Sequence, residues 1–318
     1  MPGGDAGRPG KRAALSPFIT SPNLPHAIRW NPSARCGLLK TLIERRLAEG
    51  IAALFGDMAM PDTILITGAS AGLGADFARA LAKKPVTLVL TARRTDRLAA
   101  LAQELGTRPD VEVHVISADL GRPEGVKTLL DGIADRALRI DTLINNAGYG
   151  ALGDFADSDL ATQTGMIELN VRALVTLTHA LLPPMLARGR GRVLNVASTA
   201  AFQPGPYMAV YYASKAFVLH FSEALHEEVK ARGVTVTALC PGPTRTEFAD
   251  VAGMAETPLF ERFASGSEQV VRDGLAALER GQAVMVSGLL NRLTAASTRV
   301  APRGVLRRAV AKLQSERR

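Results

Sequence analysis

Three residues in one stretch of the chain have the types and spacing of an acid/base device: Ser198, Tyr211 and Lys215. Tyr211 and Lys215 are four positions apart, so on a helix they share a face. A phenol has an ordinary pKa of about 10, and an ammonium group one turn away favours the phenolate and lowers that pKa. Because the Ser198 hydroxyl can hydrogen-bond a substrate oxygen, the three side chains predict acid/base chemistry at a C–O group.

The elements that must position these residues are short β-rich runs that alternate with helical stretches from Thr63 onward. Several runs are almost wholly apolar, as strands buried on both faces should be. The alternation predicts an α/β fold, a Rossmann-like, doubly wound, seven-stranded parallel sheet with helices on both faces. The expected strands are Thr63–Thr67, Val86–Thr91, Val111–Ser117, Thr142–Asn145, Arg192–Ala197, Thr235–Leu239 and Ala283–Ser287.

The two ends of the chain differ from this body. Residues 1–37 are rich in Pro, Gly, Arg and Ser and predict disorder, whereas apolar residues at every fourth position over 38–55 predict an amphipathic helix. We therefore expect one domain over 61–287, an extension over 1–60, and a basic tail over 288–318 with one or two amphipathic helices. The extension has three open interpretations: a dispensable segment ahead of an alternative start near Met58 or Met60, a targeting segment, or a helix that docks on the body.

The composition argues against several classes of function. The net charge of +8 comes from the ends, because residues 1–60 carry +4 and 288–318 carry +7, which leaves −3 for the body. A nucleic-acid-binding domain usually carries positive charge on its folded body, so no nucleic-acid partner is expected. Cys36 and Cys240 are the only cysteines, which predicts neither a metal site nor a disulfide framework and favours the cytoplasm. No apolar run has the roughly 18 residues of a transmembrane helix.

A glycine-rich segment, Thr67-Gly-Ala-Ser-Ala-Gly-Leu-Gly74, follows the first expected strand. Glycines at such a turn let backbone N–H groups approach a pyrophosphate at a helix N-terminus. A strand-to-helix turn without a ligand is the alternative, but the place of the segment after the first strand of a βαβ array favours a dinucleotide site. The candidate contacts are Gly68, Ser70, Gly72, Leu73 and Gly74.

The end of the second expected strand indicates which dinucleotide is bound. Sites that prefer NAD usually have an acidic residue there, which binds the ribose 2′-hydroxyl. This chain has Arg93 and Arg94, and Asp96 comes only after them. Because guanidinium groups pair well with phosphate, the two arginines predict a 2′-phosphate site and NADP(H) in preference to NAD(H). Solvated charges at a helix start are the alternative interpretation.

Together these segments resemble the short-chain dehydrogenase/reductase family, in its one-domain branch, over about 61–287. Six motifs occur in the family's order, each at its expected strand end. They are the glycine segment, Asp119-Leu120, Asn145-Asn146-Ala147-Gly148, Asn170 within Leu169-Asn-Val-Arg172, Ser198 with Tyr211-Tyr-Ala-Ser-Lys215, and Pro241-Gly-Pro-Thr-Arg-Thr246.

The resemblance implies an NAD(P)-dependent enzyme that transfers a hydride between NADP(H) and a small-molecule carbonyl or secondary alcohol. Ser198 then polarises the carbonyl, Tyr211 protonates it, Lys215 holds the nicotinamide ribose, and Asn170 supports a water path. The neighbouring Tyr212 competes with Tyr211 for the acid role, but only Tyr211 fits the family's YxxxK pattern. The further cofactor contacts that the resemblance implies are Asp119, Leu120, Asn146, Ala147, Gly148, Tyr211, Lys215, Pro241, Gly242, Thr244 and Thr246.

Two other functions share this fold. A catalytically silent, NADP(H)-binding regulatory protein would be expected to have lost Tyr211 or Lys215, and a sugar-nucleotide epimerase or dehydratase usually has another glycine spacing and a longer C-terminal domain. The segment Glu247–Ser267 is expected to cover the substrate. Its apolar residues Phe248, Met254, Leu259, Phe260 and Phe263 either line an apolar substrate site or only pack the lid. The resemblance also implies a homo-oligomer, a dimer or a tetramer.

Overall fold

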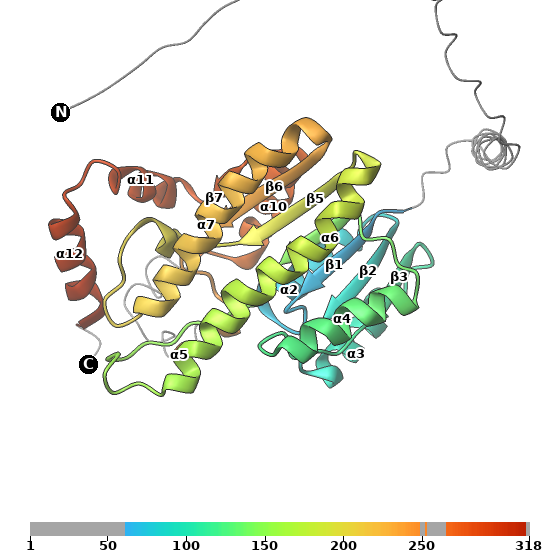
Figure 1. The fold of residues 1–318 in the computed structure, drawn as a ribbon, viewed down its shortest axis with the longest axis horizontal. Helices are drawn as coiled ribbons and strands as arrows, with labels where there is room; N and C mark the ends of the chain where they lie inside the picture. The colour runs from blue at the N-terminus through green and yellow to red at the C-terminus, as the bar shows by residue number, and fades with distance from the viewer. Residues whose placement is uncertain (1–60, 249–251, 253–264, 316–318) are drawn as a thin grey trace, which may run out of the picture. The chain divides into compact units, whose positions relative to one another are not determined.

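A seven-stranded parallel sheet forms the centre of the molecule (Figure 1). The structure is a computed structural model that describes residues 61–248, 252 and 265–315. The strand order is β3-β2-β1-β4-β5-β6-β7, which confirms the predicted architecture. The bounds are β1 (Thr63–Thr67), β2 (Val86–Thr91), β3 (Val111–Val115), β4 (Thr142–Asn145), β5 (Gly191–Val196), β6 (Val234–Cys240) and β7 (Val284–Val286).

The order of the strands reverses at β1, which pairs with β2 on one side and with β4 on the other. At such a switch point the connections leave in opposite directions and open a crevice at the carboxyl ends of the strands. Every residue of β2 is buried, as expected for a central strand covered on both faces.

Helices cover both faces of the sheet. Alternate residues of β1 point to opposite faces, so Ile64 and Ile66 belong to one buried cluster and Leu65 to another. The first cluster includes residues of α2 (Gly72–Leu81), α3 (Thr95–Leu105) and α10 (Ser267–Glu279). The second includes residues of α4 (Pro123–Asp135), α6 (Leu174–Arg188) and α7 (Ala209–Val229).

A π-helical segment, η1 (Glu168–Ala173), joins α5 (Leu160–Ile167) to α6. A π-helix has a wider turn than an α-helix, with one more residue in each hydrogen-bonded turn. Such π-helical turns are rare and frequently lie at functional sites. Asn170, a predicted site residue, lies within η1.

Beyond β7 the chain forms two helices, α11 (Leu289–Ser297) and α12 (Arg303–Ser315), as the sequence predicts for the tail. Figure 1 shows them at the end of the molecule away from β3. Among the helices in the described ranges, none has the length and apolar character needed to cross a membrane. The helix expected over 38–55, the disorder expected over 1–37, and Met254, Leu259, Phe260 and Phe263 lie outside the described residues.

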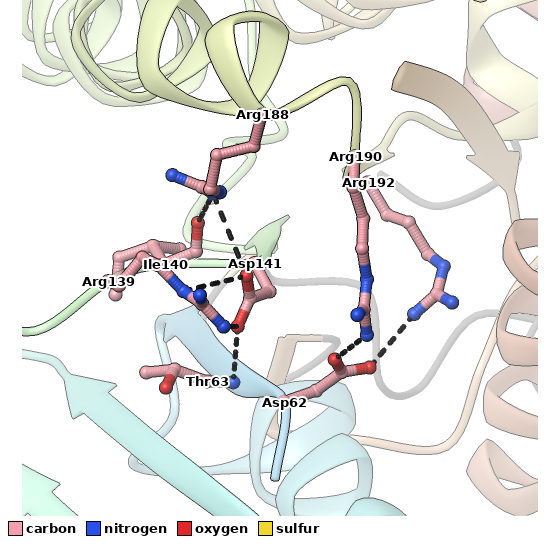
Figure 2. Close-up of polar contacts among 8 residues, drawn as sticks. All are labelled: Asp62, Thr63, Arg139, Ile140, Asp141, Arg188, Arg190 and Arg192. Carbon is pink, nitrogen blue, oxygen red and sulfur yellow. Dashed lines mark hydrogen bonds and ion pairs between the residues drawn. The ribbon is translucent and has the colours of Figure 1, made fainter. Parts of the chain in front are cut away.

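Two ion-pair clusters join the amino ends of β1, β4 and β5 (Figure 2). The buried Asp141 accepts a hydrogen bond from the backbone N–H of Thr63 (3.2 Å) and pairs with Arg139 (3.4 Å) and Arg188 (3.7 Å). The more exposed Asp62 pairs with Arg190 (2.5 Å) and Arg192 (3.1 Å). These contacts fix the amino ends of the strands, opposite the edge where the predicted site residues lie.

Candidate active site

Nearly all of the predicted site residues meet in one cavity of about 900 Å³ at the carboxyl ends of the strands. The exceptions are Gly74 and Asn170, which lie behind the cavity wall. The cavity is lined by Gly68, Ser70, Gly72, Leu73, Arg93, Arg94, Asp119, Leu120, Asn146, Ala147, Gly148, Ser198, Tyr211, Lys215, Pro241, Gly242, Thr244 and Thr246. The topology therefore places together motifs that are up to 178 positions apart, from Gly68 to Thr246.

The two neighbouring tyrosines have different partners. Tyr211 is buried in the first turn of α7, and it lines the cavity together with Ser198, which follows β5 and lies close enough to influence its pKa. Ser198 is held in place because its Oγ also accepts a hydrogen bond from the backbone N–H of Ala200 (3.1 Å). The hydroxyl of Tyr212 instead accepts a hydrogen bond from Nε2 of Gln314 (2.9 Å). This geometry favours Tyr211 over Tyr212 as the acid.

Burial has the largest effect on the pKa values of Tyr211 and Lys215. It raises the pKa of Tyr211 above its ordinary value, and the nearby Ser198 side chain counters only part of that rise. Burial also lowers the pKa of Lys215 to about 8. The Nζ of Lys215 donates to the backbone oxygen of Val196 (2.8 Å) and lies 5.8 Å from the centroid of the Tyr211 ring. The net shift of the Tyr211 pKa is thus opposite to the lowering expected from Lys215 alone.

Asn170 connects the loop after β4 to α7. Its Oδ1 accepts from the backbone N–H of Tyr149 (3.1 Å), and its Nδ2 donates to the backbone oxygen of Tyr149 (2.9 Å) and to Oγ of Ser214 (3.1 Å). Ser214 in turn donates to the backbone oxygen of Tyr211 (2.7 Å). A Cβ at Gly148 would lie 2.9 Å from Asn170 Oδ1 and 3.5 Å from Lys215 Nζ. Asn170 is therefore placed to hold this loop against the catalytic helix.

The glycine segment forms the tight turn that its composition predicts. Gly68 and Gly72 have φ values of +67° and +52°, which side chains other than glycine rarely adopt. A Cβ at Gly74 would lie 2.3 Å from the backbone oxygen of Gly68, so this glycine permits close packing of the helix on the turn. Asn146 fixes the turn from β4, since its Nδ2 donates to the backbone oxygens of Thr67 (2.9 Å) and Gly68 (3.2 Å).

The first turn of α2 is open to an anion. Its N-cap residue Ala71 provides no side-chain cap, and Ala71, Gly72 and Leu73 line the cavity. Uncapped N–H groups and the helix dipole together form a phosphate site. Thr246 lies across this turn, because a Cβ at Gly72 would approach its Cβ to 3.1 Å.

The arginines after β2 lie at the same end of the cavity. Arg94 donates to Oγ of Ser70 (3.2 Å) through both Nε and Nη2, and its Nη1 pairs with Glu247 (2.9 Å). Arg93 is exposed and lines the cavity. No acidic side chain lies between β2 and these arginines, so this end of the cavity presents cationic groups to a ligand.

Sequence reasoning missed the contribution of the tail. Leu306, Val310, Leu313 and Gln314 of α12 line the cavity, as do residues of α11. The spacing of the apolar residues marks an inner face of α12, but nothing local says what that face covers. Phe248, from the expected lid, also lines the cavity and packs on the Tyr211 ring, with centroids 5.5 Å apart.

A family comparison decides the identity. The short chain dehydrogenase family matches residues 62–256 of this chain. The chain belongs to the short-chain dehydrogenase family. It is therefore an NAD(P)-dependent oxidoreductase that acts on CH–OH or C=O groups, and the family predicted from the sequence motifs is confirmed.

The relatives of this short-chain dehydrogenase differ widely in substrate. Sulfoacetaldehyde reductase 2 of Chromohalobacter salexigens is 41% identical over 191 residues, 59% of this chain and 75% of its own. A short-chain dehydrogenase from Sphingobium yanoikuyae, solved in complex with NADPH, is 34% identical with a TM-score of 0.67, over 74% of this chain and 92% of its own. The bulky-bulky ketone specific alcohol dehydrogenase from Comamonas testosteroni is 30% identical with a TM-score of 0.65, over 76% and 94%.

Proposed function

We propose that this enzyme interconverts a carbonyl and a secondary alcohol with NADP(H), using Tyr211 as the general acid and base. The observation that carries the proposal is the close pair of the buried Tyr211 and Ser198, in the same cavity as the uncapped N-terminus of α2. An acid/base device beside a phosphate site is what hydride exchange at a C–O group requires. A silent cofactor-binding protein would not need this pair.

The residues present fit NADP(H). The turn at Gly68 and Gly72 with the first N–H groups of α2 would hold the pyrophosphate, and Arg93 with Arg94 would hold the 2′-phosphate. Asp119 and Leu120 would contact the adenine, and the loop from Pro241 to Thr246 would cover the nicotinamide end. When bound, the nicotinamide supplies or accepts the hydride.

The side chains then handle the substrate oxygen and its proton. The raised pKa of Tyr211 keeps its hydroxyl protonated at neutral pH, ready to donate to a carbonyl oxygen. Ser198 donates a hydrogen bond to the same oxygen and orients it toward Tyr211. The Lys215 ammonium stabilises the phenolate that remains after proton transfer. Asn170 acts through its neighbours, because it fixes the Gly148–Tyr149 backbone that borders Lys215.

The test compares Tyr211→Phe with Tyr212→Phe, a matched removal of the adjacent hydroxyl. We expect Tyr211→Phe to lower kcat for aldehyde or ketone reduction by about 10²–10⁴-fold, the usual contribution of a general acid. NADPH affinity, measured by fluorescence titration, should stay within a fewfold of the wild type. Tyr212→Phe should lose less than about tenfold. Turnover that survives Tyr211→Phe would show that another group is the acid.

We also propose that residues 61–287 form the catalytic unit, that the enzyme is cytoplasmic, and that it is a homo-oligomer. Support for the oligomer comes from large apolar side chains on α5 and α7, since Leu160 is 69% exposed and Phe217 is 42% exposed. Light scattering on the purified protein tests the oligomeric state, and a monomeric mass at micromolar concentration would contradict the proposed homo-oligomer.

A further inference from the structure

The C-terminal helices are seated on the active site. Asn291 of α11 packs against the loop after β6, where a Cβ at Gly242 would lie only 2.4 Å from Asn291 Nδ2. The same Nδ2 donates to the backbone oxygen of Ser287 (2.7 Å), which holds α11 close to the end of β7. Because Gly242 and Asn291 both line the cavity, α11 forms part of the cavity wall beside this loop.

The second helix, α12, has one face toward the cavity and one toward solvent. Leu306, Val310, Leu313 and Gln314 line the cavity, and Val310 and Gln314 are only 6% and 5% exposed. Arg303, Arg307 and Arg308, in contrast, are exposed. The arginines that make the tail basic thus point away from the cavity, and the surface toward it is largely apolar.

A partly buried hydrogen bond joins α12 to α7, the helix that carries Tyr211. Nε2 of Gln314 donates to the hydroxyl of Tyr212, and the Tyr212 ring lies edge to face with the Tyr211 ring at 6.0 Å. Since Tyr211 faces the reacting oxygen, the space between Tyr211 and α12 is where the rest of a substrate would extend. The cavity is therefore continuous from the acid/base pair to Val310.

We propose that α12 is the distal wall of the substrate site and that Val310 is a specificity-determining residue, selecting carbonyl compounds with an apolar chain. The inference rests on the proposed function, because it assigns the far end of that same site. Burying each added methylene of such a chain against this wall should raise affinity about three- to fourfold. Once the apolar chain of the substrate reaches Val310, further methylene groups should no longer raise its affinity.

The experiment compares two tryptophan substitutions on opposite faces of α12. Val310→Trp fills the cavity face, whereas Val305→Trp places the same ring where the valine is 58% exposed and does not line the cavity. The kcat/KM values of 2-butanone and 2-octanone with NADPH give a ratio for each protein. We expect Val310→Trp to lower the ratio of 2-octanone to 2-butanone at least tenfold and Val305→Trp to keep the wild-type ratio. Equal ratios in all three proteins, or an equal loss in both variants, would overturn the proposal.

Two further measurements test the role of Val310, one without a bulky substitution and one without turnover. Val310→Ala enlarges the site without a clash, so the gain in affinity with chain length should continue to longer 2-ketones; a gain that ends at the wild-type length counts against the proposal. Thermal stabilisation by 2-butanol and 2-octanol reports binding without turnover. If the wild type reduces no ketone, the proposed function fails, yet a weaker stabilisation of Val310→Trp than of the wild type by 2-octanol, with equal stabilisation by 2-butanol, still supports α12 as the distal wall. Equal stabilisation of both proteins by 2-octanol overturns the proposal.

Discussion

The guanidinium of Arg94 and the carboxylate of Glu247 form an ion pair of 2.9 Å across the phosphate end of the cavity. Arg97 pairs with the same carboxylate, and the two arginines hold the pKa of Glu247 below its ordinary value. Glu247 belongs to the segment that is expected to cover the substrate, so this pair connects that segment to the proposed 2′-phosphate site. An anion that binds Arg94 must compete with Glu247.

The competition predicts that Glu247→Gln increases affinity for NADPH. Removing the carboxylate frees Arg94 and ends its repulsion of a phosphate, and the usual strength of exposed ion pairs corresponds to about a two- to fivefold gain. NADH lacks the 2′-phosphate and is the control, since its affinity should not change. Isothermal titration calorimetry measures both, and an unchanged or weaker NADPH affinity would contradict the competition.

Arg93→Ala should reduce the preference for NADPH over NADH. Loss of a charge-assisted bond to a phosphate corresponds to about 10- to 100-fold in NADPH affinity. Arg136→Ala is the control, because Arg136 is an exposed arginine that does not line the cavity. The prediction fails if the wild type has no preference, or if Arg93→Ala leaves the preference intact.

Lys215 should make the protein more stable as the pH rises from 7 to 9. Its pKa is about 8 in the folded chain against an ordinary value of 10.5, so between these values the unfolded chain binds more protons and the free energy of unfolding rises with pH. The gain attributable to Lys215 is about 1 kcal/mol over this interval. Urea unfolding at both pH values measures it.

The controls for this effect are two neutral substitutions. Lys215→Met should be more stable than the wild type at pH 7, with a smaller difference at pH 9. Lys83→Met, at an exposed lysine, should leave the pH dependence as in the wild type. A constant difference between Lys215→Met and the wild type at the two pH values would show that Lys215 titrates normally.

The amino ends of the sheet offer a stability test of their own (Figure 2). Asp141→Ala removes a buried acceptor of the Thr63 N–H and should lower the free energy of unfolding by about 1–3 kcal/mol. Asp62→Ala removes a partly exposed ion pair and should cost at most about 1 kcal/mol. Urea unfolding of both variants gives the comparison. Equal losses of unfolding free energy in the two variants would mean that the burial of Asp141 adds nothing to the stability of the fold.

Most of the site could be predicted because its motifs are local. Short apolar runs, the glycine turn after Thr67 and the four-residue spacing of Tyr211 and Lys215 each follow from neighbours in the chain. Parallel strands bring their carboxyl ends to one edge, so the motifs at those ends had to meet. The hydrogen bonds of Asn170 to the Tyr149 backbone could not be predicted in this way, because the two residues are 21 positions apart and no local pattern relates them.

The sequence by itself determined the strands, the glycine turn, the candidate acid/base residues and the family, since all of these depend on residue types at short spacings. Tertiary structure decided which tyrosine lies beside Ser198, which way the Tyr211 pKa shifts, and what α12 covers. Gln314 and Tyr212 are 102 positions apart, and no local pattern relates them. Burial and long-range contacts are properties of the packed chain, which is why only the fold could show that the basic tail lines the same cavity as Tyr211.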